Sequence, residues 1–169
     1  MRIYAIDPGN EKSAYVVYDT TTDKIIEFGI YDNESMLSIL RTAYNGHLAI
    51  EMIASYGMAV GKTVFETCLW IGRFIEANNA VWHIWLQHQH KPHTLIYRKD
   101  VKMFLCNSTK AKDSNIRQAI IDRYPASGGG KCPQIGTKKK PGPLYGISKD
   151  IWSALAVALT YAKNEMLKS

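Results

Sequence analysis

The sequence predicts a mixed α/β fold in which three sequential strands are followed by alternating helices and strands. Three apolar, β-prone runs lie within the first 31 residues, and short polar turns join them. Helical and strand-like patterns then alternate to the end of the chain, which is typical of a mixed sheet with helices packed on its faces. With 169 residues, 46% of them hydrophobic, the chain has the length and the apolar content of one domain with a single core. We therefore expect residues 1–169 to form one domain.

The first half of the chain contains four expected strands and one expected helix. The first strand ends at Asp7, where Asp-Pro-Gly is a turn signal, and three sequential strands joined by short turns indicate an antiparallel meander. Apolar residues recur at helical spacing from Glu34 to Tyr44, and a short apolar strand that ends in Glu51 follows them. The expected strands are 2–7, 13–18, 24–31 and 47–51.

The second half alternates longer helices with short strands and contains one long loop. Residues 62–77 carry the apolar stripe of a long amphipathic helix. Residues 125–147 are rich in Gly, Pro and Lys and lack periodicity, so we expect a basic loop there. The other expected elements are strands at 81–86 and 95–97 and helices at 99–105, 112–124 and 149–165.

Three acidic residues occupy positions that suggest a shared site. Asp7 and Glu51 each end an apolar strand, and Asp150 lies at the start of the last helix beside a strongly apolar stripe. Each residue alone has an ordinary structural explanation, because Asp is common in turns and at helix starts. Together, the three carboxylates could converge on one point, where their mutual repulsion favours a divalent cation. Such ions can activate water and stabilise the leaving oxygen of a phosphodiester.

Basic residues are concentrated in one part of the chain. Residues 1–90 carry 6 Lys+Arg against 10 Asp+Glu, whereas residues 91–150 carry 13 against 4, and the whole chain has a net charge of +6. A basic region of this size favours a polyanionic partner such as DNA, although a solvated basic face is an equally good explanation on charge alone.

Four landmarks in order resemble those of the RuvC family of Holliday junction resolvases. They are Ile6-Asp7-Pro8-Gly9 with the strand that follows it, the strand ending in Glu51, the Lys-rich helix start at 110–116, and the last helix from Asp150. Their order and spacing extend over nearly the whole chain. The resemblance implies a ribonuclease H-like fold, with a mixed five-stranded sheet (three antiparallel strands, then parallel strands) and helices on both faces.

The same resemblance implies a function and a set of site residues. The protein is expected to be a magnesium-dependent endodeoxyribonuclease that cleaves Holliday junctions or other branched DNA by two-metal-ion hydrolysis in recombination or repair, with Mn²⁺ able to substitute. Asp7, Glu51 and Asp150 would be metal ligands, and Lys112 would lie near the scissile phosphate. The expected DNA-binding residues are Lys62, Lys110, Arg117, Lys138, Lys139, Lys140 and Tyr145.

One position departs from the family pattern. The last helix of the family usually offers two metal-binding residues three apart, but here Asp150 fills the first position and Ser153 the second. Asp113 is a candidate catalytic substitute for the missing acid. Its alternative role is that of a capping or first-turn acid of its helix.

Two other patterns suggest different chemistry and are set aside. Gly57 to Thr63 resembles a phosphate-binding loop but is one residue short between its glycines, so we expect no nucleotide cofactor. His83, His88, His90 and His93 lack the spacing and the cysteine partners of a zinc site, and their role stays open.

The resemblance also implies a homodimer, because resolving a four-way junction requires two symmetric nicks; helix 62–77 is the candidate interface. No apolar run is long enough for a membrane span, and we expect a cytoplasmic protein of a bacterial cell or a phage-infected host. Two alternatives remain open. One is a non-catalytic module that binds branched DNA, and the other is a fragment of an actin-like ATPase, a class that requires a second lobe.

Overall fold

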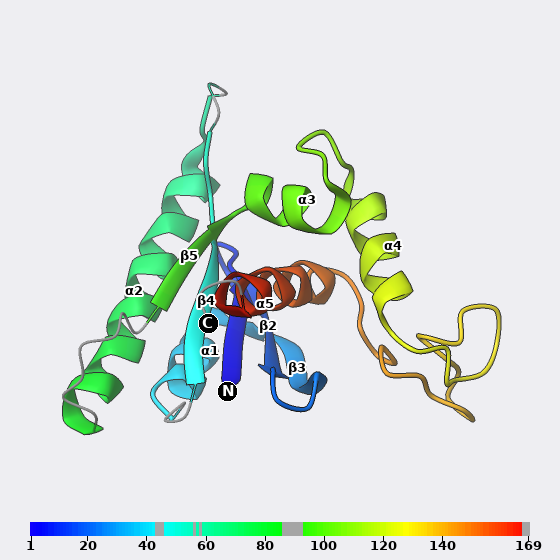
Figure 1. Ribbon diagram of the computed structural model, residues 1–169. Helices are drawn as coiled ribbons and strands as arrows, with labels where there is room; N and C mark the ends of the chain where they lie inside the picture. Colours follow the sequence, from blue (N-terminus) through cyan, green and yellow to red (C-terminus); the bar gives the residue numbers. More distant parts are fainter. Residues whose placement is uncertain (43–45, 56, 58, 86–92, 167–169) are drawn as a thin grey trace.

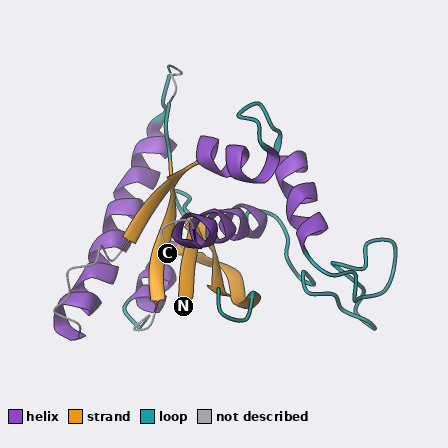
Figure 2. Ribbon diagram, viewed as in Figure 1, coloured by secondary structure: helices purple, strands orange, loops and turns teal. Residues whose placement is uncertain are grey.

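The fold is built on one mixed sheet. The computed structural model describes residues 1–42, 46–55, 57, 59–85 and 93–166. Within this part of the chain, a five-stranded sheet has the strand order β3-β2-β1-β4-β5 (Figures 1 and 2). The strands are β1 (Arg2–Asp7), β2 (Lys12–Asp19), β3 (Lys24–Asp32), β4 (Gly46–Met52) and β5 (His93–Tyr97).

Strand direction divides the sheet into two halves. β1 pairs with β2, and β2 with β3, in antiparallel register, whereas β1 pairs with β4, and β4 with β5, in parallel. The carboxyl ends of β1, β4 and β5 therefore meet at the same edge of the sheet, which is where parallel sheets commonly place their functional residues. The expected antiparallel-then-parallel sheet is confirmed.

Helices cover both faces of the sheet. α1 (Asn33–Leu40) and α2 (Lys62–Trp85) pack on one face, and α5 (Ile151–Met166) crosses the other face over β1 and β2 (Figure 1). α3 (Arg98–Cys106) and α4 (Asp113–Arg123) extend away from the sheet on the side of α5, and the loop that follows α4 reaches furthest out (Figure 1). None of the helices in the described ranges is long and apolar enough to cross a membrane.

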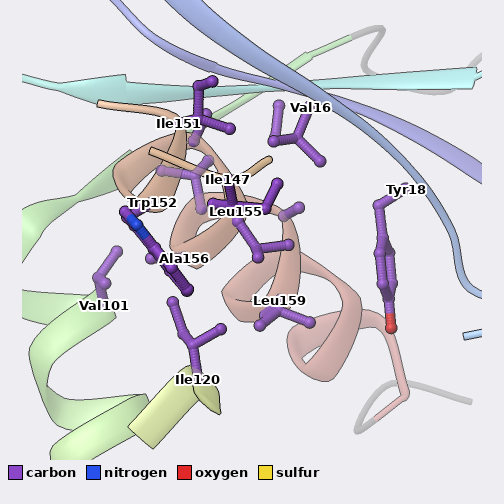
Figure 3. Packing of buried hydrophobic residues seen from close by; sticks show 14 of the residues in the cluster. Val16, Tyr18, Val101, Ile120, Ile147, Ile151, Trp152, Leu155, Ala156 and Leu159 are labelled. Atoms are coloured by element: carbon purple, nitrogen blue, oxygen red, sulfur yellow. The ribbon is translucent and has the colours of Figure 1, made fainter. Parts of the chain in front are cut away.

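The last helix lies in the middle of the larger hydrophobic core. Every residue from Ala154 to Leu159 is fully buried, as expected for a helix that is apolar on all sides and enclosed by other elements. Figure 3 shows Ile151 near Val16 of β2, while Trp152 lies toward Val101 of α3 and Ile120 of α4. This packing between the sheet and the outer helices fixes the position of the amino-terminal end of α5.

The long loop between α4 and α5 is folded by its own backbone hydrogen bonds. The amides of Gly128, Gly129 and Gly142 donate to the carbonyl groups of Pro133, Lys140 and Ile135, at 2.8, 2.9 and 3.0 Å. A Cβ atom at Gly142 would lie 2.3 Å from the Pro133 oxygen, so this close approach requires glycine. The loop is anchored by the fully buried Leu144.

Three expectations about individual elements are wrong. Residues 81–85 continue helix α2 and form no strand, and the fifth strand is instead β5, which includes the short run expected at 95–97. A short apolar run that directly follows a helix fits either structure, and its periodicity cannot separate the two. In addition, α1 ends at Leu40, short of the expected Tyr44, and α5 begins at Ile151, so Asp150 directly precedes the helix.

Candidate active site

Three neighbouring parallel strands each lead into a charged residue at one edge of the sheet. Asp7 is the last residue of β1, Glu51 is the penultimate residue of β4, and Arg98 directly follows β5 and begins α3. The register places these ends side by side, because Ile6 pairs with Ile50 and Glu51 pairs with Ile96. A small cavity of about 200 Å³ is lined by Asp7, Glu51 and Arg98.

The start of α5 adds Asp150 and Ser153 to this edge. The Ser153 hydroxyl is close enough to Asp7 to lower the pKa of its carboxyl group, and the charge of Asp150 raises that pKa. Since buried residues of α5 hold the helix against β1 and β2, its first turn has a fixed position over the end of β1. The structure thus brings together the three acids that the sequence singled out.

Arg98 lies among the acidic side chains and contacts several of them. One terminal nitrogen of its guanidinium, Nη1, lies 3.3 Å from Oε2 of Glu51 and 3.4 Å from Oγ of Ser153. The other, Nη2, donates to Oδ1 of Asp113 at 2.6 Å, a short charge-assisted hydrogen bond. Only a quarter of the Arg98 side chain is exposed. The guanidinium therefore links the end of β4 with the first turns of α4 and α5.

Burial and like charges shift the titration of two of the acids. Burial, and then the charges of Glu51 and Asp150, raise the pKa of Asp7 to about 7, against smaller opposing effects of Arg98 and of the Ser153 hydroxyl. Burial also raises the pKa of Glu51, and Arg98 opposes that shift. A divalent cation would lower the free-energy cost of ionising these buried acids, because it compensates the carboxylate charges.

The donor set at this edge fits a hard divalent cation. Asp7, Glu51 and Asp150 supply carboxylate oxygens, which are the ligands preferred by Mg²⁺ and Mn²⁺. Within the described part of the chain, no group of three carboxylate, histidine or cysteine side chains is already arranged to hold a metal ion. The carboxylate of Glu51 is directed to Arg98 instead. Metal binding would therefore require these side chains to turn toward a common point.

Asp113 and Lys112 lie at the start of α4. Asp113 is the first helical residue, its side chain is 80% exposed, and its described partner is Arg98. Lys112 is the N-cap residue of α4 and is exposed to solvent. The contact between Asp113 and Arg98 brings this basic helix start next to the acidic cluster.

The expected DNA-binding residues lie on two sides of the acidic cluster. Lys62 begins α2 and pairs at 3.4 Å with Glu66, which also accepts a hydrogen bond from Asn10 in the loop after β1. On the other side, Lys110 precedes α4 and is exposed, and the guanidinium of Arg117 lies 4.9 Å from the ring centre of Trp152.

A broad groove extends from the acidic cluster between α4, the long loop and the start of α5. It has a volume of about 770 Å³, and Ile135, Ile147 and Trp152 give it an apolar floor. Arg98, Asp113, Asp150 and Ser153 line it next to the cluster, while Arg117 and Lys149 add positive charge. The groove is large enough to hold part of a nucleic-acid strand.

The basic loop presents its lysines at a tight turn. The backbone groups of Thr137 and Lys140 bond to each other in both directions, so Lys138, Lys139 and Lys140 lie at the tip, all exposed. Tyr145 is 42% exposed. Both features leave these side chains accessible to a ligand.

Arg98 is the site residue that the sequence analysis missed. A signal was present, because Arg98 directly follows an extended run next to the strand that ends in Glu51. A single arginine after a short strand is otherwise unremarkable, and its partners are 47, 55 and 15 residues away along the chain. Of the histidines considered, His88 and His90 lie outside the described residues, as does the side chain of His83, and His93 begins β5.

Comparison with known proteins identifies the fold. No protein-family model and no curated protein matches the sequence. Among solved structures, the RuvC structure of Thermus thermophilus is similar at 14% sequence identity, with a TM-score of 0.69 over 99% of this chain and 97% of that chain. T. thermophilus RuvC in complex with a Holliday junction substrate is similar at 16% identity, with a TM-score of 0.63 over 99% of this chain and 96% of that one.

The mixed five-stranded sheet with helices on both faces matches the ribonuclease H-like fold. More specifically, the likeness extends over nearly the full length of the RuvC Holliday junction resolvase structures, and the fold expected from the resemblance is confirmed.

Proposed function

We propose that residues 1–169 form a single nuclease domain that cleaves Holliday junctions or other branched DNA by metal-dependent phosphodiester hydrolysis. The observation that carries this proposal is the convergence of Asp7, Glu51 and Asp150 at one edge of a RuvC-like fold. The pKa of Asp7 is raised because the residue is buried and lies close to the other two carboxylates. A purely structural role does not explain why two largely buried carboxylates, those of Asp7 and Glu51, lie beside the exposed Asp150 at this edge.

Mg²⁺ is the proposed physiological ion, and Mn²⁺ is expected to replace it. Asp7, Glu51 and Asp150 would hold the ions for two-metal hydrolysis. Bound ions of this kind activate water and stabilise the leaving oxygen of the phosphodiester. The residues of the chain would hold the ions, exclude bulk water by the burial of Asp7 and Glu51, and place Lys112 near the scissile phosphate.

Positive charge on both sides of the acidic cluster supports DNA as the substrate. Lys62 lies beside the loop after β1, and Arg117 and Lys110 lie on or next to α4. Lys138, Lys139 and Lys140 extend this basic surface outward on the loop, where they would contact phosphates, and the exposed ring of Tyr145 would stack on an unpaired base. A nuclease of this kind acts where DNA is replicated and recombined, so we propose the cytoplasm of a bacterial cell or a phage-infected host as its location.

A direct test uses a four-way junction with a label on each strand in turn. With Mg²⁺ the protein is expected to cut two opposite strands near the branch point, to leave a linear duplex of the same sequence intact, and to lose activity in EDTA. Cleavage of both substrates at equal rates would contradict the structural selectivity.

The alternative proposal is a non-catalytic module that binds branched DNA. Ser153 favours it, because a hydroxyl stands where the resemblance leads us to expect an acid. Tight and selective binding of the junction without cleavage in Mg²⁺ or Mn²⁺ would establish the binding module and reject the nuclease.

A further inference from the structure

Arg98 lies between the small cavity and the broad groove of the candidate site. The small cavity holds Asp7 and Glu51, and the groove holds Asp113, Asp150 and Ser153, while Arg98 lines both. A guanidinium in this position separates Glu51 from the acids at the starts of α4 and α5. It is also close enough to Asp7 to act on its charge.

The contacts of Arg98 use the oxygen atoms that a metal ion would need. Its Nη1 lies within 3.3 Å of Oε2 of Glu51, and the Glu51 side chain is only 13% exposed, so few other ligands can reach that carboxylate. The same nitrogen lies 3.4 Å from Oγ of Ser153, at the position that lacks an acid. A cation held here repels a second cation and occupies one of its ligands.

Asp113 gives the guanidinium a second anchor. It accepts the shortest of the Arg98 contacts, at 2.6 Å, and its side chain is largely exposed. Asp113 can therefore keep its bond to the guanidinium when the contact between Arg98 and Glu51 breaks. The planar fork of arginine suits this arrangement, because its two terminal nitrogens can serve different carboxylates.

We propose that Arg98 is a built-in competitor for divalent ions at Glu51, and that it sets the metal concentration that the site requires. This inference rests on the proposed function, because it assumes that the carboxylates bind metal. Arg98 occupies the Glu51 side of the cluster, so the ion that Glu51 helps to hold binds more weakly than it would without the arginine. Entry of that ion moves the guanidinium away from Glu51 and leaves it on Asp113.

The test measures Mn²⁺ binding without DNA, by the electron paramagnetic resonance signal of free Mn²⁺ during a titration. Arg98→Gln removes the charge and is expected to tighten binding of the weaker ion by about tenfold, as expected when one nearby unit charge is removed from a partly solvated site. Arg98→Lys keeps the charge but loses the fork, so its affinity should lie between those of wild type and Arg98→Gln. Arg73→Gln is the matched control, because Arg73 pairs with Glu34 on the surface at 2.9 Å, outside the site.

Each outcome decides the proposal. Weaker Mn²⁺ binding by Arg98→Gln would show that Arg98 orients Glu51 as a ligand, and an isotherm equal to that of Arg73→Gln would show that the arginine has no influence; either result overturns the competition. If Arg98→Gln does not fold, Arg98→Lys decides, and an affinity no higher than that of wild type overturns the competition.

Glu51→Gln must abolish the weaker site, since otherwise the ion binds elsewhere and the inference falls. If the wild-type protein binds Mn²⁺ as expected but cuts no junction, the proposed cleavage fails, while the metal binding on which the inference rests, and the inference about Arg98, stand. Absence of Mn²⁺ binding in every variant would reject both.

Discussion

At the scale of single residues, the buried carboxyl group of Asp7 lowers the stability of the folded protein when it is ionised. It is largely buried at the end of β1, close to Glu51 and Asp150, and its pKa is raised to about 7. The folded protein therefore retains a proton on Asp7 at pH values where the unfolded chain has lost it. Retaining such a residue at the expense of stability is typical of functional sites.

Asp7→Asn is predicted to stabilise the metal-free protein in a pH-dependent way. Between about pH 4 and 7 the folded state binds more protons at Asp7 than the unfolded state, so wild-type stability falls as the pH rises through this window. The asparagine variant lacks this penalty and should be more stable than wild type at pH 8 by roughly 2–4 kcal/mol, with little difference at pH 4.

Urea denaturation in EDTA at both pH values measures this effect. Asp122→Asn, an exposed change on α4, serves as the control, and its free energy of unfolding should equal that of wild type at both pH values. A variant no more stable than wild type at pH 8 would contradict the assigned cost. Added Mg²⁺ should reduce the gap, because metal binding stabilises only the wild-type site.

The sequence predicts the acids of the site better than their cationic partner. Asp7 and Glu51 end apolar strands, so strand pattern and residue type together indicate a functional edge. Arg98 follows its strand in the same way, but a positive charge there has an ordinary explanation as a solvated residue. Its contacts with Glu51 and Ser153 arise from the packing of β5 and α5, which local sequence does not encode.

At the scale of elements, strong local patterns predict structure well where tertiary packing agrees with them. All three antiparallel strands and β4 match their expected positions within about two residues, and short polar turns separate β1 from β2 and β2 from β3. Helix α2 is the exception, since the apolar residues after Asn79 fit a strand or a continued helix equally well. The loop at 125–147 was expected as a loop, but its internal bonding depends on glycines that approach backbone atoms across it.

Replacing Lys138, Lys139 and Lys140 together by Ala is predicted to weaken junction binding and to reduce its salt dependence. All three lie exposed at the tip of the loop, so their removal should not disturb the core. The slope of log K against log salt concentration should become shallower by up to roughly 0.9 for each phosphate that the variant no longer neutralises.

Binding measured by fluorescence anisotropy at several salt concentrations tests this role of the loop. The double variant Lys24→Ala/Lys163→Ala removes exposed lysines outside the basic stretch and should leave the slope unchanged. An unaltered slope in the triple variant would mean that the loop is a solvated segment that does not touch DNA.

At the scale of the whole molecule, the two faces of the sheet have different surroundings. α5 is enclosed by the sheet and the outer helices, whereas α2 exposes Phe65 and Leu69, which are 61% and 71% accessible and lie one turn apart. Two large exposed apolar side chains on one helix face suit an interface with a second copy, and two symmetric nicks in a four-way junction require two active sites. We therefore expect a homodimer that uses α2.

Leu69→Glu is predicted to convert the dimer into a folded monomer, because it places a charge within an apolar interface. Light scattering should give twice the 19.1 kDa of one chain for the wild-type protein and a single chain for the variant. Ile26→Glu, at a 53% exposed position on β3, is the control and should remain dimeric. A monomeric wild-type protein at micromolar concentration would refute this arrangement.

The catalytic role of the acidic cluster is tested by single-turnover cleavage of a labelled four-way junction by Asp7→Asn in Mg²⁺, together with a measurement of junction binding by the same protein. The cleavage rate is expected to fall by about 100-fold or more, because one of the metal ligands is removed. Binding should be unchanged or tighter, since removing a negative charge lessens repulsion of the phosphates. Asp122→Asn should cut at the wild-type rate. Cleavage by folded Asp7→Asn at the wild-type rate would contradict the claim that the acids at this edge of the sheet form the catalytic centre.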